Sequence, residues 1–287
     1  MNKIGVIGAG QMGRGIAQVT AQAGYDVVMS DIELELAEAG RGRIEKDLGK
    51  LIARGKIDEA GVAAALGRIE PTANMAAFAD CDFIVEAATE NEEIKRQIFA
   101  KLRPKPEAVL ATNTSSISIT GLATQTDRPT RFLGLHFFNP VPVMKLIEII
   151  PGLATSDDTI ARVRAFCEAI GKQPIEAEDR PAFIVNRILC PMMNEAIFAL
   201  GEGAGTIEDI DKGLVLGANH PMGPLALADF VGLDTLYAIM QVMQRETGDQ
   251  KYRPAPLLTK YVEAGWLGRK SGRGFYDYAG ETPVPTR

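Results

Sequence analysis

The first 180 residues alternate between short apolar runs rich in β-branched residues and longer stretches with apolar positions at helical spacing. This alternation is typical of an α/β fold in which helices cross over between strands of a doubly wound, mostly parallel sheet. The apolar runs predict strands over residues 3–7, 26–30, 82–87, 108–112, 131–138, 145–150 and 173–177.

Between the second and third of these strands lies the charged segment ELELAEAGRGRIEKDLGKLIARGK, residues 33–56. Its apolar positions recur at helical spacing, and it is longer than a minimal crossover. We expect a helical hairpin that projects from the sheet.

The pattern changes at Ala182, after which apolar residues follow helical spacing and no further strand alternates convincingly. Thr206 followed by Asp209 predicts a helix start, and Gly217, Gly248 and Gly265 predict helix stops. The chain is therefore expected to form two domains. Residues 1–181 would make the sheet domain, and residues 182–287 an all-helical domain for substrate binding and dimerisation.

Composition places the chain among soluble globular proteins, with 46% hydrophobic and 24% charged residues. A net charge of -6 argues against a nucleic-acid surface, which needs clustered Lys and Arg. Met1 and Asn2 are followed by KIGVIGAG with no secretory pattern, and no run of 18 apolar residues predicts a membrane helix. We expect a cytosolic protein.

Cys81, Cys167 and Cys190 are widely spaced and form no C-x-x-C pattern. This spacing favours neither a disulfide framework nor a zinc site, so we interpret the three as small buried hydrophobes and expect no metal.

Gly8, Gly10 and Gly13 stand in G-x-G-x-x-G spacing between a predicted strand and a predicted helix. In that context the glycines allow a tight turn, close approach of a pyrophosphate and close packing of helix on strand. Alone, the motif is weak evidence, because a glycine-rich structural turn has the same spacing. Asp31, 18 residues after Gly13, ends the next strand where a ribose-binding acid belongs, which predicts a Rossmann-type site for NAD rather than NADP.

Ligands of an open parallel sheet bind beyond the carboxyl ends of its strands, so polar residues after strands are candidates. The alternatives are structural. Ser115 or Ser116 is suited to capping the next helix, and Glu90 with Lys95 is suited to a solvated surface pair. The candidates are Glu90, Lys95, Asn113, Ser115, Ser116, His136 and Asn139.

His136 lies in an apolar run, where a packed core histidine is the commoner meaning. Glu148 follows inside a second apolar run, LIEIIPG. A buried carboxylate is costly unless it is paired, and a histidine on the adjacent strand supplies the partner. Such a pair makes a competent general base. Asn186 is a polar amide on an otherwise apolar helix turn, suited either to a helix contact or to a substrate carbonyl.

Taken together, these motifs resemble the 3-hydroxyacyl-CoA dehydrogenases, and the resemblance covers nearly the whole chain. It rests on GAGQMG with Asp31, EAATENEEIK, NTSSISIT, GLHFFNPVPVMKLIEII, FIVNR, NHPMGPLALADFVGLD and GRKSGRGFYDY. It implies NAD-dependent, reversible and metal-free oxidation of an (S)-3-hydroxyacyl-CoA of short chain length.

The resemblance also implies a role for each matching residue. His136 would be the catalytic base, oriented by Glu148, while Ser115 and Asn186 hold the substrate. The charged hairpin would hold coenzyme A, with Lys50, Arg54 and Lys56 as candidates, although a solvated helix face is the commoner meaning of such a run. The residues implied to contact NAD are Gly8, Ala9, Gly10, Gln11, Met12, Gly13, Asp31, Glu90, Lys95, Asn113, Ser115, Asn139 and Lys270.

The chain departs from the family at Ala182, where Pro-Gly usually precedes FIVNR, and this raises the question of hinge mobility. His220, in the segment NHPMGP, is expected to be structural. Apolar residues 222–243 predict a homodimer through the C-terminal helices. Two rival functions remain open at this stage: a dehydrogenase of a free hydroxy acid or sugar acid of the lambda-crystallin type, and a catalytically silent NAD-binding protein.

Overall fold

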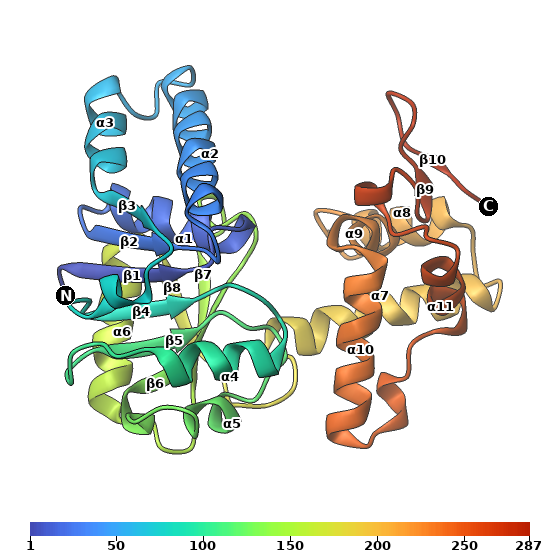
Figure 1. Cartoon of the computed structure of the whole chain (residues 1–287). Helices are drawn as coiled ribbons and strands as arrows, with labels where there is room; N and C mark the ends of the chain where they lie inside the picture. The colour runs from blue at the N-terminus through green and yellow to red at the C-terminus, as the bar shows by residue number, and fades with distance from the viewer. The chain divides into compact units, whose positions relative to one another are not determined.

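The computed structural model describes residues 1–287 and divides into two compact units, Met1–Phe183 and Ile184–Arg287. The boundary lies two residues beyond the predicted one. The first unit is a doubly wound α/β domain and the second is built mainly of helices (Figure 1).

The first unit is organised around one eight-stranded sheet of order β3-β2-β1-β4-β5-β6-β7-β8. Every neighbouring pair is parallel except β6 and β7, which confirms a mostly parallel sheet. The strands are β1 (Lys3–Ile7), β2 (Asp26–Ser30), β3 (Ile69–Thr72), β4 (Phe83–Glu86), β5 (Val109–Thr112), β6 (Phe132–Phe137), β7 (Leu146–Pro151) and β8 (Gln173–Glu176).

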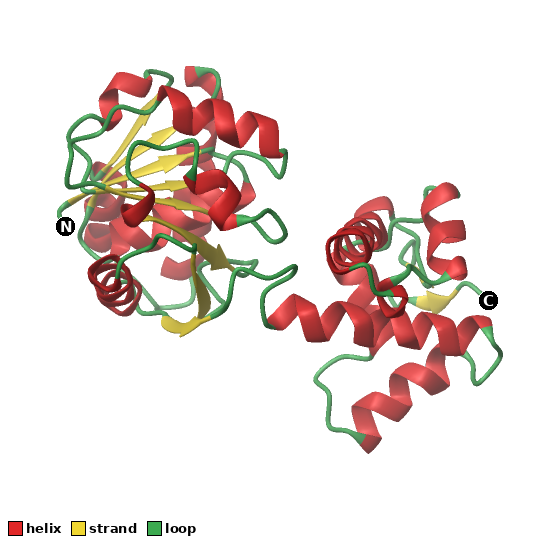
Figure 2. Ribbon diagram, turned by 90° about the horizontal axis from the view of Figure 1, so that it is seen from below, coloured by secondary structure: helices red, strands yellow, loops and turns green.

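Helices cover both faces of this sheet, as Figure 2 shows for the layer of yellow strands. One core cluster joins the strands to α1 (Gln11–Gln22), α2 (Leu34–Ile52), α3 (Glu59–Gly67) and α6 (Asp157–Ala169). The other face carries α4 (Glu92–Lys101), α5 (Ile119–Ala123) and the short 3-10 helix η1 (Met75–Phe78). A second 3-10 helix, η2 (Pro129–Arg131), precedes β6. Strands buried on both faces explain why the sequence shows continuous apolar runs there.

The predicted hairpin is formed by α2 and α3, which extend beyond the sheet in Figure 1. It reaches Gly67, further along the chain than the segment predicted from charge and periodicity. Strand β3 follows directly and was missed. It is a four-residue edge strand, IEPT, and its proline weakens the strand pattern.

The second unit contains α7 (Val185–Gly201), α8 (Ile207–Gly217), α9 (Pro224–Val231), α10 (Leu233–Thr247) and α11 (Pro256–Glu263), with 3-10 helices η3 (Gln250–Tyr252) and η4 (Arg269–Ser271). The Thr206 side chain caps α8 by accepting from the Asp209 N–H, as predicted. One correction is needed. A two-residue pairing of β9 (Tyr276–Asp277) with β10 (Val284–Pro285) makes this unit not all-helical, and strands this short leave no periodic signal.

No single helix is long and apolar enough to cross a membrane; α9 and α10 reach that length only as a pair bent by 94°. The three cysteines are buried free thiols, as predicted. Burial raises the pKa of Cys81 to about 11, which keeps its thiol protonated.

Candidate active site

The glycine loop connects β1 to α1. A Cβ on Gly13 would lie 1.8 Å from the carbonyl oxygen of Gly8, so this glycine permits helix and strand to pack closely. Gly8 has φ +98 and its Cβ would collide with the backbone of Ala87. A Cβ on Gly10 would meet nothing within 4 Å. The loop therefore keeps open surface at the N-terminus of α1, where backbone N–H groups favour a phosphate.

Asp31 follows β2 and is held beside this loop. Its carboxylate accepts hydrogen bonds from the backbone N–H of Ala9 and of Ile32, each at 2.8 Å. These bonds fix the carboxylate and leave further lone pairs for ribose hydroxyls. The negative charge would repel a 2′-phosphate. The loop and Asp31 together fit an NAD adenosine and pyrophosphate.

His136 and Glu148 stand directly opposite each other on the antiparallel strands β6 and β7. The imidazole Nδ1 lies 2.6 Å from Glu148 Oε2. The carboxylate is fully buried and His136 is 5% exposed. The predicted pairing of these two polar groups inside apolar strands is confirmed.

Ser115 completes a line of three side chains. Its Oγ lies 3.1 Å from Nε2 of His136, the nitrogen that faces away from Glu148. Two aromatic rings flank the imidazole, Phe138 at 4.6 Å and Phe183 at 5.6 Å between ring centroids. The histidine is thus oriented by a carboxylate on one side and enclosed by apolar rings.

Glu90 organises the loop that carries Ser115. One of its carboxylate oxygens, Oε1, accepts from Thr114 Oγ1 at 2.7 Å, from the Ser115 N–H at 2.8 Å and from Ser116 Oγ at 3.1 Å. Neither serine caps the next helix, because Ser118 caps α5. The capping alternative was therefore wrong.

Lys95 was expected at the cofactor, or else in a solvated pair with Glu90. It is instead fully buried, with its ammonium 2.5 Å from Glu86 Oε2. Thr112 Oγ1 donates to the same oxygen at 2.7 Å. The solvated pair with Glu90 was therefore wrong, and the buried ammonium is instead neutralised by the Glu86 carboxylate. Contact of Lys95 with NAD stays a prediction. Sequence reasoning missed Glu86. Glu86 is a carboxylate within an apolar strand segment, and this is the same pattern by which Glu148 was found.

Two asparagines link the strand ends. Asn113 Oδ1 accepts from the backbone N–H of Phe137 at 3.0 Å, which ties the end of β5 to β6. Asn139 Oδ1 accepts from Gln11 Nε2 at 2.9 Å, which ties the segment after β6 to the glycine loop. The nucleotide loop and the histidine strand are therefore connected by hydrogen bonds.

A hollow of about 260 Å³ lies between α1, α2 and residues 139–143. Lys50 and Arg54 line it, and so does Arg14, which sequence reasoning missed because it lies in α1, away from the charged hairpin. Asp47 is also in the lining, 2.7 Å from the Lys50 ammonium. Lys56 is not part of this lining. The hollow therefore presents three cations and one carboxylate.

Comparison with known proteins agrees with this geometry. Residues 3–180 match the NAD binding domain of 3-hydroxyacyl-CoA dehydrogenase, and residues 183–278 match its C-terminal domain. The chain belongs to the 3-hydroxyacyl-CoA dehydrogenase family.

Relatives in this family align over the full chain. A 3-hydroxybutyryl-CoA dehydrogenase of Bradyrhizobium diazoefficiens is 55% identical over 100% of this chain and 99% of its own. A probable 3-hydroxybutyryl-CoA dehydrogenase of Deinococcus radiodurans is 56% identical over 96% of this chain and 100% of its own. The crystal structure of (S)-3-hydroxybutyryl-CoA dehydrogenase from Ralstonia eutropha superposes with a TM-score of 0.95 at 49% identity, covering 98% and 100%.

Membership confirms the resemblance seen in the sequence, the NAD cofactor and NAD-dependent 3-hydroxyacyl-CoA dehydrogenase activity. The rival of a catalytically silent protein is thereby set aside.

The other residues expected at the site of this dehydrogenase lie in the second unit. Asn186 is half-buried in the first turn of α7, and Lys270 in η4 forms an ion pair of 2.5 Å with Asp234. Their contacts with substrate and NAD stay predictions. His220 follows α8 in a turn, where its backbone N–H bonds to Leu214.

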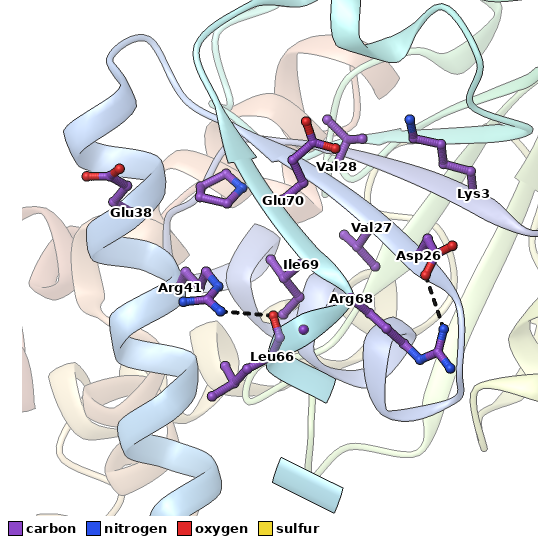
Figure 3. Close-up of a pocket in the computed structure, with 12 residues that line it drawn as sticks. Lys3, Asp26, Val27, Val28, Glu38, Arg41, Leu66, Arg68, Ile69 and Glu70 are labelled. Carbon is purple, nitrogen blue, oxygen red and sulfur yellow. Dashed lines mark hydrogen bonds and ion pairs between the residues drawn. The ribbon is translucent and has the colours of Figure 1, made fainter. Parts of the chain in front are cut away.

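A second hollow, of about 750 Å³, lies in the first unit (Figure 3). It borders β2, β3 and α2. Its two guanidinium groups are already engaged, Arg41 with the carbonyl of Leu66 and Arg68 with Asp26. None of the predicted site residues lines it, so we assign it no part in the chemistry.

Proposed function

We propose that the substrate of this dehydrogenase is a short-chain (S)-3-hydroxyacyl-CoA, 3-hydroxybutyryl-CoA, which it oxidises reversibly to acetoacetyl-CoA. The names of its relatives support the chain length, since relatives 55% and 56% identical over nearly the whole chain, and a solved structure 49% identical, are named 3-hydroxybutyryl-CoA dehydrogenases. The observation that carries the chemistry is the line formed by Ser115, His136 and Glu148.

His136 acts as the general base in this proposal. Its Nε2 accepts the proton of the substrate 3-hydroxyl, while Nδ1 remains hydrogen-bonded to Glu148. The imidazole becomes positively charged, and the buried carboxylate stabilises that charge. In the reverse direction the same Nε2 returns the proton to the 3-oxo oxygen.

The remaining residues bind and orient. Ser115 shares its hydroxyl between His136 and the substrate oxygen, and Asn186 bonds the thioester carbonyl. NAD, when bound, would accept the hydride that leaves C3 of the substrate. The glycine loop and Asp31 would hold its adenosine and pyrophosphate, and Glu90, Lys95, Asn113, Asn139 and Lys270 are the further residues proposed to contact it. Lys95 supports the Asn113 backbone, since its ammonium lies 3.4 Å from that carbonyl oxygen.

The basic hollow takes the phosphates of coenzyme A. Arg14, Lys50 and Arg54 supply positive charge there, and guanidinium groups form strong charge-assisted hydrogen bonds with phosphate. The set of coenzyme A-binding residues therefore differs from the one predicted from the sequence. It now includes Arg14 together with Lys50 and Arg54, and it no longer includes Lys56. A homodimer formed through the second unit is also part of the proposal.

Steady-state kinetics with NADH test the substrate. Acetoacetyl-CoA should be reduced with a kcat/KM at least about 100-fold above that of free acetoacetate, because coenzyme A contributes binding energy to catalysis. A 3-oxoacyl-CoA with a ten-carbon chain should also be poorer. Equal rates with the free acid would favour the hydroxy acid rival, and a preference for the long chain would refute the chain length.

A further inference from the structure

The segment between β8 and α7 is anchored to the active-site side of the first unit through Asp179. Its Oδ1 accepts from the Ile119 N–H at 3.0 Å, and its Oδ2 from the Thr120 N–H at 2.8 Å and from Ser118 Oγ at 3.3 Å. A carboxylate that gathers two backbone N–H groups and a hydroxyl is firmly held. Asp179 thereby fixes the start of α5.

The residues that Asp179 binds directly follow the loop that carries Ser115. Only Ser116 and Ile117 separate Ser115 from Ser118, and Glu90 holds the other end of this loop through Thr114. The loop is therefore fixed on both sides of Ser115, by Glu90 before it and by Asp179 after it. The 3.1 Å contact from Ser115 Oγ to His136 depends on that arrangement.

Four residues after Asp179, the same segment returns to the histidine. Phe183 is 5% exposed, and its ring lies 5.6 Å from the His136 ring at an interplanar angle of 59°. Asp179 and Phe183 thus hold the Ser115–His136 pair from two directions.

The backbone between them is strained. Ala182 has φ 67 and Phe183 has φ 52, a left-handed conformation that costs a residue with a side chain about 1–2 kcal/mol. Such strain persists only where the surroundings over-determine it. Ala182 is 1% exposed, so burial and the Asp179 anchor together impose this conformation.

We propose that Asp179 is a positioning residue for catalysis, because it keeps Ser115 and Phe183 in place around His136. The inference rests on the proposed roles of His136 and Ser115. Asp179 acts on the histidine indirectly, through the loop that carries Ser115 and through the strained segment that carries Phe183. Its loss should therefore lower turnover without weakening the nucleotide site.

Asp179→Ala and Asp179→Asn test this proposal by kcat, by NADH affinity and by melting temperature. We expect kcat to fall about 10-fold or more in Asp179→Ala, because small misplacements of catalytic groups are costly. NADH affinity should stay within about twofold, since the glycine loop and Asp31 lie elsewhere. Asp179→Asn should recover part of kcat, because the amide oxygen still accepts hydrogen bonds.

Asp82→Ala is the matched control. Asp82 also accepts hydrogen bonds from two backbone N–H groups, those of Asn2 and Lys3. It directly precedes β4, at the N-terminal end of that strand, whereas the site residues follow the C-terminal ends of the parallel strands. Its loss should lower the melting temperature and leave kcat near the wild-type value. Equal kcat losses in the two alanine variants, or a wild-type kcat in Asp179→Ala, would overturn the proposal.

Phe183→Leu provides a second, milder variant that keeps an apolar side chain. It should lower kcat by itself, and combined with Asp179→Asn the loss should be less than multiplicative. Multiplicative losses would overturn the coupling. His136→Ala separates the two levels of the account. If it retains full activity, the proposed chemistry fails; if it is inactive while Asp179→Ala is fully active, only this inference fails.

Discussion

Glu148, Glu86 and Glu90 each pair a carboxylate with a different kind of partner, and of the three Glu148 and Glu86 are fully buried whereas Glu90 is exposed. Glu148 faces an imidazole, Glu86 faces the Lys95 ammonium, and Glu90 gathers hydroxyl and backbone N–H groups. An unpaired charge would be costly at the two buried positions, Glu148 and Glu86. The three pairings fix the loops and strands around His136.

These three carboxylates differ in how well the sequence predicts them. Glu148 was predictable because both it and His136 lie in apolar runs that read as strands. The partners of Glu90 were not, since they come from a loop whose path no periodicity encodes. The ion pair of Lys95 with Glu86 was not predictable, because EEIKRQ has the charge pattern of a solvated helix and the pairing depends on how that helix packs on the sheet.

Asp82 gives a prediction for stability against pH. Burial opposes its ionisation, but hydrogen bonds from Asn2, Lys105 and Lys3 outweigh it and lower the pKa of Asp82 from 3.8 to about 2. A lowered pKa contributes stability that is present above pH 3.8 and is lost as the pH falls through 2.

Urea unfolding of wild type and Asp82→Asn at several pH values checks this. The variant should be less stable at pH 7, and the difference should shrink as the pH falls from 4 toward 2. A difference that stays constant over this range would show that ionisation of Asp82 contributes nothing.

Among the helices and strands, those with a clear hydrophobic pattern in the sequence were predictable, and the shortest ones were not. The seven predicted strands correspond to observed strands with ends shifted by at most one residue. The missed β3 and the β9–β10 pair are short, and their positions depend on neighbours rather than on local pattern. The existence of the helical hairpin was predictable, although its end was not, because its segment is more highly charged and longer than a minimal crossover between two strands.

The hairpin element carries a prediction on coenzyme A. Lys50→Ala and Arg54→Ala, and Arg14→Ala on the facing helix, should each raise the KM for acetoacetyl-CoA about 3–10-fold, the size expected for an exposed charge-assisted contact. The kcat should change little. Lys46→Ala is the control, since Lys46 is exposed on the same helix α2 and does not line the hollow. An equal effect of Lys46→Ala would indicate general charge attraction instead of a site.

At the scale of the whole molecule, the family and the division into two units were predictable, because long family motifs occur in the sequence of each unit. The apolar residues from which the homodimer was predicted are only partly available to a partner. Much of residues 222–243 is buried within the second unit, including Leu225, Leu236 and Met240. The large apolar side chains exposed in this unit are Ile184, Ile188, Leu216, Phe230 and Val284, and only Phe230 lies within residues 222–243.

These exposed side chains still favour a partner, because apolar surface gains free energy when it is covered. Light scattering at micromolar concentration should return a mass near twice 30.9 kDa. Leu216→Glu, 74% exposed in the single chain, should shift the population toward monomer if that surface is covered. A wild-type mass of 30.9 kDa would contradict the dimer.

The central claim is that His136 and Glu148 act as one catalytic unit. Replacing His136 with Ala should leave NADH affinity nearly intact and lower kcat by about 100-fold or more through loss of the general base. Glu148→Gln should also lower kcat, because a neutral amide bonds the imidazole without stabilising its positive charge.

The most direct measurement is therefore kcat for His136→Ala, Glu148→Gln and the double variant, with NADH affinity measured alongside. Coupled catalytic residues are strongly non-additive, so the double variant should be little worse than His136→Ala alone. Multiplicative losses in the double variant, or full activity in His136→Ala, would contradict the account and leave the pair a structural contact between β6 and β7.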